Sequence, residues 1–243
     1  ATPGKPATPG RPLTQQEVES SVQQLSGTQG DKDWSKQQTA LEQLGVALRA
    51  RSQHSQLLAG LPMIAKTVLR FANSERSSLA RVALERVADF LGSPELAPKL
   101  SKDAVSAMVA ELLRRVSGSS KFLVDIANEA LLSKGTATIP RQLSRELLRH
   151  AESKSKEQRA AVAASLALCW ANIPAGLVVD IAELTQQAQV MLALSKDNLS
   201  ETRAAARRAL STMVSKVDPA LFKAVAKQLN PREWAAVQAE LSA

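Results

Sequence analysis

The chain has 243 residues, of which 44% are hydrophobic and only 3% aromatic, and its formal net charge is +8. An apolar content made of Ala, Leu and Val favours packed helices over sheet, in one large domain or two small ones. No apolar run approaches the roughly 20 residues of a membrane span, and the single Cys169 excludes an internal disulfide or a Cys-based zinc cluster.

The N-terminal stretch lacks the apolar core of a signal peptide. With one cysteine, the composition fits a reducing compartment. Charges before residue 31 cancel, so the basic surplus belongs to the rest of the chain. An acidic partner surface is therefore expected, either nucleic acid or an acidic protein.

Residues 1–12, ATPGKPATPGRP, are predicted to form a linker because they are rich in Pro and Gly. A first helix is predicted from Thr14, with Glu17 completing a capping box, to Gly27. The following breaks at Gly, Pro and polar residues predict further helices. Their expected ranges are 34–50, 52–72, 77–91, 102–116, 120–134, 140–152, 156–171, 177–194, 200–217, 219–229 and 231–241.

The predicted helices form pairs that repeat along the chain. Equivalent positions near the start of each second helix are Gln38, Arg81, Val124, Arg159 and Arg203, with steps of 43, 43, 35 and 44 residues. A period near 40 with two helices per unit is typical of HEAT repeats. The sequence therefore predicts an all-α fold, an α-solenoid of six HEAT repeats, with a shorter turn at the step of 35.

Trp34 stands at the mouth of the second predicted helix, outside its apolar stripe. Two interpretations are open. The ring can fold back onto the core as packing, or it can stand on a rim as a contact, flanked by Asp33, Ser35 and Lys36. An exposed Trp would be an effective anchor, since it buries a large area at low entropic cost.

Across residues 13–243, this plan resembles the TOG domain of microtubule regulators. The segment Asp33-Trp34-Ser35-Lys36 looks like the first TOG loop, and the segments 73–81, 119–125, 153–159 and 195–203 resemble the other four. The sequence of the third segment, Ser119-Ser120-Lys121-Phe122-Leu123, is similar to the third loop of the crescerin (TOGARAM) and CLASP types of TOG domain.

The resemblance implies a non-catalytic domain whose loops line one edge and bind αβ-tubulin, regulating microtubule dynamics without a cofactor. It implies a monomeric module of a larger multidomain protein in the cytoplasm and cytoskeleton, including the cilium, axoneme or centrosome. The residues it assigns to tubulin binding are Trp34, Lys36, Arg76, Ser77, Lys121, Lys154, Lys156, Lys196 and Asn198. Since three successive loops carry lysine, stacking of the repeats is expected to line these lysines up.

Several other residues have structural interpretations. Asp197 and Arg203 are expected to pair within the solenoid, whereas Arg81 and Arg159 can serve either packing or binding. Cys169 and Trp170 are expected in the core, as is Trp234. The two histidines, His54 and His150, have no ligand-spaced partners and are predicted to lie on the surface.

Two rival functions remain open at this point. One is a generic HEAT scaffold that binds another protein while Trp34 packs in the core. The other is nucleic-acid binding, which the scarcity of aromatics and the mixing of acids with bases disfavour. No phosphate loop, nucleophile elbow or paired-carboxylate motif points to an enzyme, and neither nucleic acid nor a membrane is an expected partner.

Overall fold

The computed structural model describes residues 33–176, 180–232, 234, 235 and 238, together with 16, 20, 23 and 25. The predicted linker and most of the first predicted helix lie outside these residues. The four described positions of that helix are helical, and Leu25 is buried in the core. No helix in the described ranges has both the length and the apolar character required to cross a membrane.

The described part of the chain contains helices and no strand. The helices are α2 (Trp34–Arg49), α3 (His54–Ala72), α4 (Ser77–Gly92), α5 (Lys102–Val116), α6 (Lys121–Glu129), α7 (Thr136–Thr138), α8 (Pro140–Leu147), α9 (Lys156–Asn172), α10 (Ile181–Leu194), α11 (Ser200–Lys216) and α12 (Pro219–Ala226). Short 3-10 turns are η2 (Arg51–Gln53), η3 (Ala97–Lys99) and η5 (Leu148–His150), and η4 (Ala130–Gly135) is a π-helix.

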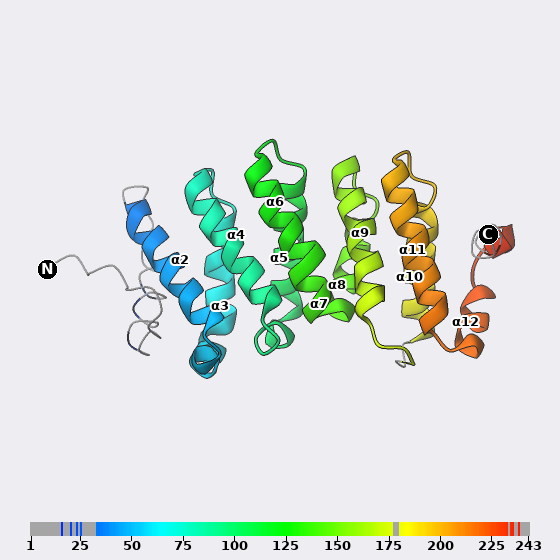
Figure 1. Cartoon of the computed structure of the whole chain (residues 1–243), viewed down its shortest axis with the longest axis horizontal. Coiled ribbons are helices and arrows are strands. Elements are labelled where there is room, and N and C mark those ends of the chain that lie inside the picture. The colour runs from blue at the N-terminus through cyan, green and yellow to red at the C-terminus, as the bar shows by residue number, and fades with distance from the viewer. Residues whose placement is uncertain are drawn as a thin grey trace, which may run out of the picture.

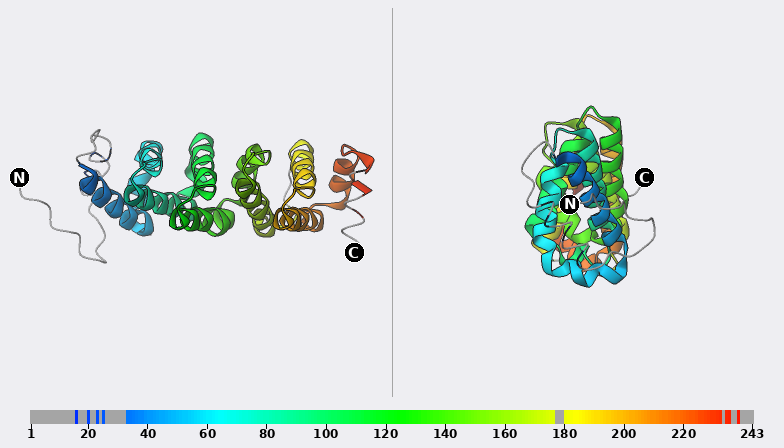
Figure 2. Two further views of the ribbon diagram at one scale, coloured as in Figure 1. Left: turned by 90° about the horizontal axis from the view of Figure 1, so that it is seen from above. Right: turned by 90° about the vertical axis from the view of Figure 1, so that its left-hand side faces the viewer.

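The helices form two layers in an elongated row (Figures 1 and 2). One layer holds α2, α4, α6, α9 and α11, and the other holds α3, α5, α8 and α10. This arrangement confirms the predicted α-solenoid of antiparallel helix pairs, in which α2 is the second helix of the first repeat, and α3–α4, α5–α6, α8–α9 and α10–α11 form the second to fifth repeats. The short step is confirmed as well, since α6 begins at Lys121 and α9 at Lys156. It is short mainly because Ile139 alone connects α7 to α8, whereas residues 93–101 connect α4 to α5, so the predicted shorter turn is present.

The core runs continuously between the layers. In α2, the predicted stripe of Ala40, Leu41, Leu44, Ala47 and Leu48 is buried, as the i, i+3, i+4 spacing requires. Farther along, α9 packs against α11 over a surface rich in buried alanines. One repeat cannot bury its apolar face alone, so each repeat is stabilised by packing against its neighbours.

The predicted core residues in the second half are confirmed. Trp170 is 1% exposed and Cys169 is fully buried. Burial raises the pKa of the Cys169 thiol, which makes it an unreactive apolar group. Trp234 is partly buried against the core, with its ring centroid 5.1 Å from that of Phe222.

The prediction that Gly135 ends the sixth helix is wrong. The helical turn continues through η4 and α7 as far as Thr138. Gly135 is buried, and a Cβ there would lie 3.0 Å from Leu143 Cδ2. The lack of a side chain at Gly135 thus permits a close approach to α8, and it does not end the helix.

Other boundaries differ by a few residues. The helix predicted from 52 begins at His54 after η2, and it continues through Pro62. The helix predicted from 177 begins at Ile181, while residues 177–179 lie outside the described part. The predicted helix 219–229 ends at Ala226. In the last predicted helix, positions 231, 232, 234, 235 and 238 are helical.

Candidate functional site

The loops within the repeats lie along one long edge of the solenoid, the upper edge in Figure 1. Because successive helix pairs stack in the same orientation, every turn from a first helix to its second helix reaches this edge. We call it the loop edge, formed by the start of α2 and the connections 73–76, 117–120, 151–155 and 195–199. The exposed residues that it carries include all those assigned by the resemblance: Trp34, Lys36, Arg76, Ser77, Lys121, Lys154, Lys156, Lys196 and Asn198.

Trp34 is the first residue of α2 and is 40% exposed. Its exposure excludes the interpretation that the ring is packed in the core. The Cζ of Arg76, from the next repeat, lies 5.9 Å from the centroid of the Trp34 ring. This cation–π geometry joins the first two loops of the edge. Lys36 Nζ lies 3.0 Å from Asp33 Oδ1, an exposed pair that contributes little stability.

The second loop is held in place by the third repeat. Arg115 of α5 donates hydrogen bonds to the main-chain oxygens of Ala72 and Ser74, the latter at 3.1 Å. Ser74 Oγ in turn accepts a hydrogen bond from the main-chain N–H of Arg76 at 3.2 Å. Arg76 and Ser77 are therefore presented on a loop fixed by partly buried hydrogen bonds, which lowers the entropic cost of binding through them.

A second exposed aromatic on the edge, Phe122, was not assigned a role from the sequence. It lies in the first turn of α6, is 50% exposed, and has the Cζ of Arg81 5.5 Å from its ring centroid. The apolar stripe of α6 consists of Leu123 and Ala127, so Phe122 is displaced from it by one position. That offset is the signal in the sequence that an aromatic here points away from the core.

The fourth and fifth loops are joined by an internal pair, but its members differ from those predicted. The carboxylate of Asp197 accepts a hydrogen bond from Arg159 Nε at 2.5 Å, across the repeat boundary. Arg203 instead donates to the main-chain oxygens of Asp197 at 2.8 Å and Asn198 at 2.9 Å. Arg159 therefore has a structural role between two repeats, and Arg203 stabilises the connection 195–199, which directly precedes its own helix. The sequence offers Asp197 two candidate partners, Arg159 and Arg203. Which of them reaches its carboxylate depends on how the two neighbouring repeats pack.

The hydrogen bond from Arg159 holds the pKa of the Asp197 carboxyl below its ordinary value of 3.8, against the opposing effect of partial burial. A depressed pKa in the folded state contributes stability at pH values above the ordinary range, and that contribution is lost as pH falls through the folded pKa.

We expect Asp197→Asn to lower the free energy of unfolding at pH 6, by an amount that shrinks below about pH 4. Denaturant unfolding at a series of pH values measures this. Asp125→Asn, at an exposed position on α6, is the control. Parallel pH profiles for Asp197→Asn and the parent would contradict the assignment.

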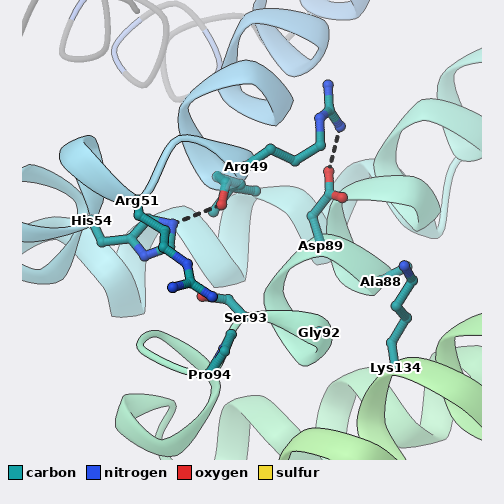
Figure 3. A pocket seen from close by; sticks show the side chains of 10 residues that line it. Arg49, Arg51, His54, Ala88, Asp89, Gly92, Ser93, Pro94 and Lys134 are labelled. Carbon is teal, nitrogen blue, oxygen red and sulfur yellow. Dashed lines mark hydrogen bonds and ion pairs between the residues drawn. The ribbon is translucent and has the colours of Figure 1, made fainter.

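The opposite edge holds a pocket of about 270 Å³ between the ends of α2 and α4 (Figure 3). Its charged side chains are paired: Arg49 with Asp89 at 2.9 Å, Arg51 with Glu95 at 3.8 Å, and Lys134 with Glu129 at 3.7 Å. The pocket is thus lined by ion-paired side chains that connect the first three repeats, and we assign no functional site to it.

His54 lies in this region, and its predicted surface position is wrong. The ring is buried, with Nε2 2.8 Å from the main-chain oxygen of Leu48 and Nδ1 against the Glu95 carboxylate. Because α3 begins directly after η2, its first side chain meets the unpaired carbonyls at the end of α2. His150 is half-buried. In the described ranges, no three His, Cys, Asp or Glu side chains form a group that could hold a metal.

Solved structures with the same fold were found by comparison. One is described as crescerin using a TOG domain array to regulate microtubules in the primary cilium. It has a TM-score of 0.56 and 16% identity over 90% of this chain and 88% of that one. Another concerns TOG–tubulin binding specificity in microtubule dynamics and mitotic spindle formation, with a TM-score of 0.58 and 14% identity over 96% and 89% of the two chains. No protein-family model matches the chain, and no curated protein matches it in sequence.

Proposed function

We propose that this chain, whose fold is that of TOG domains, binds αβ-tubulin through the loop edge and has no catalytic role. The observation that carries the proposal is the exposed Trp34 at the start of the edge, with Arg76 beside its ring. Aromatic and arginine side chains dominate the binding energy of protein interfaces. The similar structures, which concern TOG domains acting on tubulin and microtubules, supply the partner.

The remaining assigned residues would contact tubulin around this anchor. The third, fourth and fifth loops of the edge and the helix starts beside them carry Lys121, Lys154, Lys156 and Lys196, which suit an acidic surface. The same loops also carry acids such as Glu75, Glu157 and Glu201. We therefore expect charge to orient the encounter and Trp34 to supply most of the affinity.

On this proposal, residues 13–243 form one tubulin-binding module of a larger protein that regulates microtubule dynamics. A single weak site gains avidity when it is linked to others in an array. Its place in the cell would be the cytoskeleton, including cilia or centrosomes. Size-exclusion chromatography with free tubulin and pelleting with microtubules distinguish binding to the soluble dimer from binding to the lattice.

Trp34→Glu is expected to abolish co-elution with tubulin, weakening binding by at least about tenfold, because it removes the anchor and adds a charge opposed to an acidic partner. The matched control is Met63→Glu, which places the same charge on a 55% exposed apolar position in the middle of α3, away from the edge. Both variants should unfold cooperatively like the parent. Co-elution of Trp34→Glu at the level of the parent would contradict tubulin binding through this edge.

A further inference from the structure

We propose that Phe122 is a second aromatic anchor on the loop edge, held in position by Arg81, and that it takes an apolar side chain flanked by carboxylates on the tubulin surface. The inference rests on the proposed function and deepens it. It adds an apolar contact beside Lys121 in the third repeat and assigns a role to two residues outside the set implied by the resemblance.

The exposure of Phe122 is the first observation. Half of its surface is open to solvent, and it lies at the first turn of α6, beside the exposed Lys121. The neighbouring Leu123 is 5% exposed and supplies the packing that this turn gives to the core. Phe122 is thus an aromatic side chain whose outer half has no packing role, although exposing apolar area to water is unfavourable.

The second observation is the placement of Arg81. Its guanidinium carbon lies over the Phe122 ring, and its Nε is 3.8 Å from Glu85 Oε1, one helical turn along α4. Contacts on two sides restrict the rotamers of Arg81 before any partner arrives, and its guanidinium in turn restricts the Phe122 ring. Restricting a side chain in advance lowers the entropic cost of binding.

The third observation is the relation between the two aromatic pairs. Arg76 and Arg81 both come from the second repeat, Trp34 comes from the first, and Phe122 from the third. The two arginines therefore lie between two aromatics, and one pair crosses each of the first two repeat boundaries. We call this set, Trp34, Arg76, Arg81 and Phe122, the aromatic–arginine strip.

The chemistry of the strip determines the partner that fits it. Aromatic rings and arginine are the side chains most enriched at the centre of protein interfaces. A guanidinium stacked on a ring keeps its planar N–H donors at its rim, where Arg76 can meet a carboxylate, while Arg81 acts by positioning Phe122. The strip thus suits a surface that presents an apolar side chain next to Asp or Glu, whereas a bare run of acidic residues would leave the Phe122 ring uncovered.

The test is a titration of fluorescent αβ-tubulin with the full chain and its variants. Phe122→Ala is expected to weaken binding about tenfold while the protein still unfolds cooperatively, with a midpoint lowered only by the loss of the buried half of the ring. Leu168→Ala is the matched control, because Leu168 is a 37% exposed apolar residue in the last turns of α9, away from the loops. It should bind like the parent.

Arg81→Ala and the double variant test the positioning role of Arg81. If Arg81 acts through Phe122, the double variant will bind about as well as Phe122→Ala alone. A loss equal to the product of the two single losses would overturn the positioning role. If Phe122→Ala binds tubulin within twofold of the parent while Trp34→Glu loses binding, the role of Phe122 as a second anchor is wrong and the proposed function stands. If the parent chain itself does not bind tubulin, both the proposed function and the second anchor are wrong.

Discussion

Replacing Trp170 with alanine is expected to lower the free energy of unfolding by about 3–5 kcal/mol. Trp170 is among the largest fully buried side chains of the core, and α9 presents it between the two layers. Its Nε1 donates a 2.9 Å hydrogen bond to Oε1 of Gln187, which is itself 2% exposed. Truncation would leave both a cavity and an unsatisfied buried acceptor.

Trp170→Phe separates the two costs. It keeps most of the ring volume but loses the hydrogen bond, so a smaller loss of about 1–2 kcal/mol is expected, to which a small residual cavity also contributes. Denaturant unfolding monitored by circular dichroism measures both variants, and the dependence on denaturant concentration should stay constant. A loss below about 1 kcal/mol for Trp170→Ala would contradict the close packing at this position.

Gly45→Ala is expected to destabilise the protein by about 1–3 kcal/mol, through overpacking. Helix propensity alone predicts the opposite sign, since alanine in a helix interior is favoured over glycine by about 1 kcal/mol. The structure reverses the expectation because a Cβ at Gly45 would lie 2.1 Å from Arg86 Nη1. Arg86 is buried, with Nε 2.9 Å from Asp89 Oδ2 and Nη1 donating to the main-chain oxygen of Leu41.

To admit the methyl group, the guanidinium would have to leave both partners, and breaking a buried ion pair is costly. The control is Gly45→Ala in an Arg86→Leu background, measured as a double-mutant cycle. There the clash is absent, and the alanine should be neutral or stabilising. A Gly45→Ala variant that is more stable than the parent with Arg86 in place would contradict the packing described.

Local sequence patterns predicted most of the architecture. The spacing of apolar residues in α2 predicted its buried face, and the polar breaks near residues 76, 120, 155 and 199 predicted the turns that form the loop edge. Once the repeats are recognised, stacking places those turns on one side. For that reason the alignment of the loop lysines could be anticipated from the sequence, whereas the exposure of Trp34 was only one of two interpretations and was decided by the structure.

The features that were missed depend on how separate helices and turns meet. Gly135 was taken for a helix end because its own turn does not reveal that Leu143 of α8 packs against it. His54 was placed on the surface because its partners, Leu48 and Glu95, are set by how two turns meet. The role of Phe122 likewise requires knowledge that Arg81 of the preceding repeat lies over its ring.

The central claim is that tubulin is bound at the loop edge, and carbodiimide cross-linking of the complex followed by mass spectrometry tests it most directly. The reagent joins lysine amines to carboxylates in contact with them. Binding through the loop edge predicts links to tubulin from Lys121, Lys154, Lys156 and Lys196. It predicts none above background from Lys99 and Lys102, which are also exposed but lie by the connection before α5 at the opposite edge. Links concentrated at Lys99 and Lys102, or distributed evenly over all lysines, would contradict it.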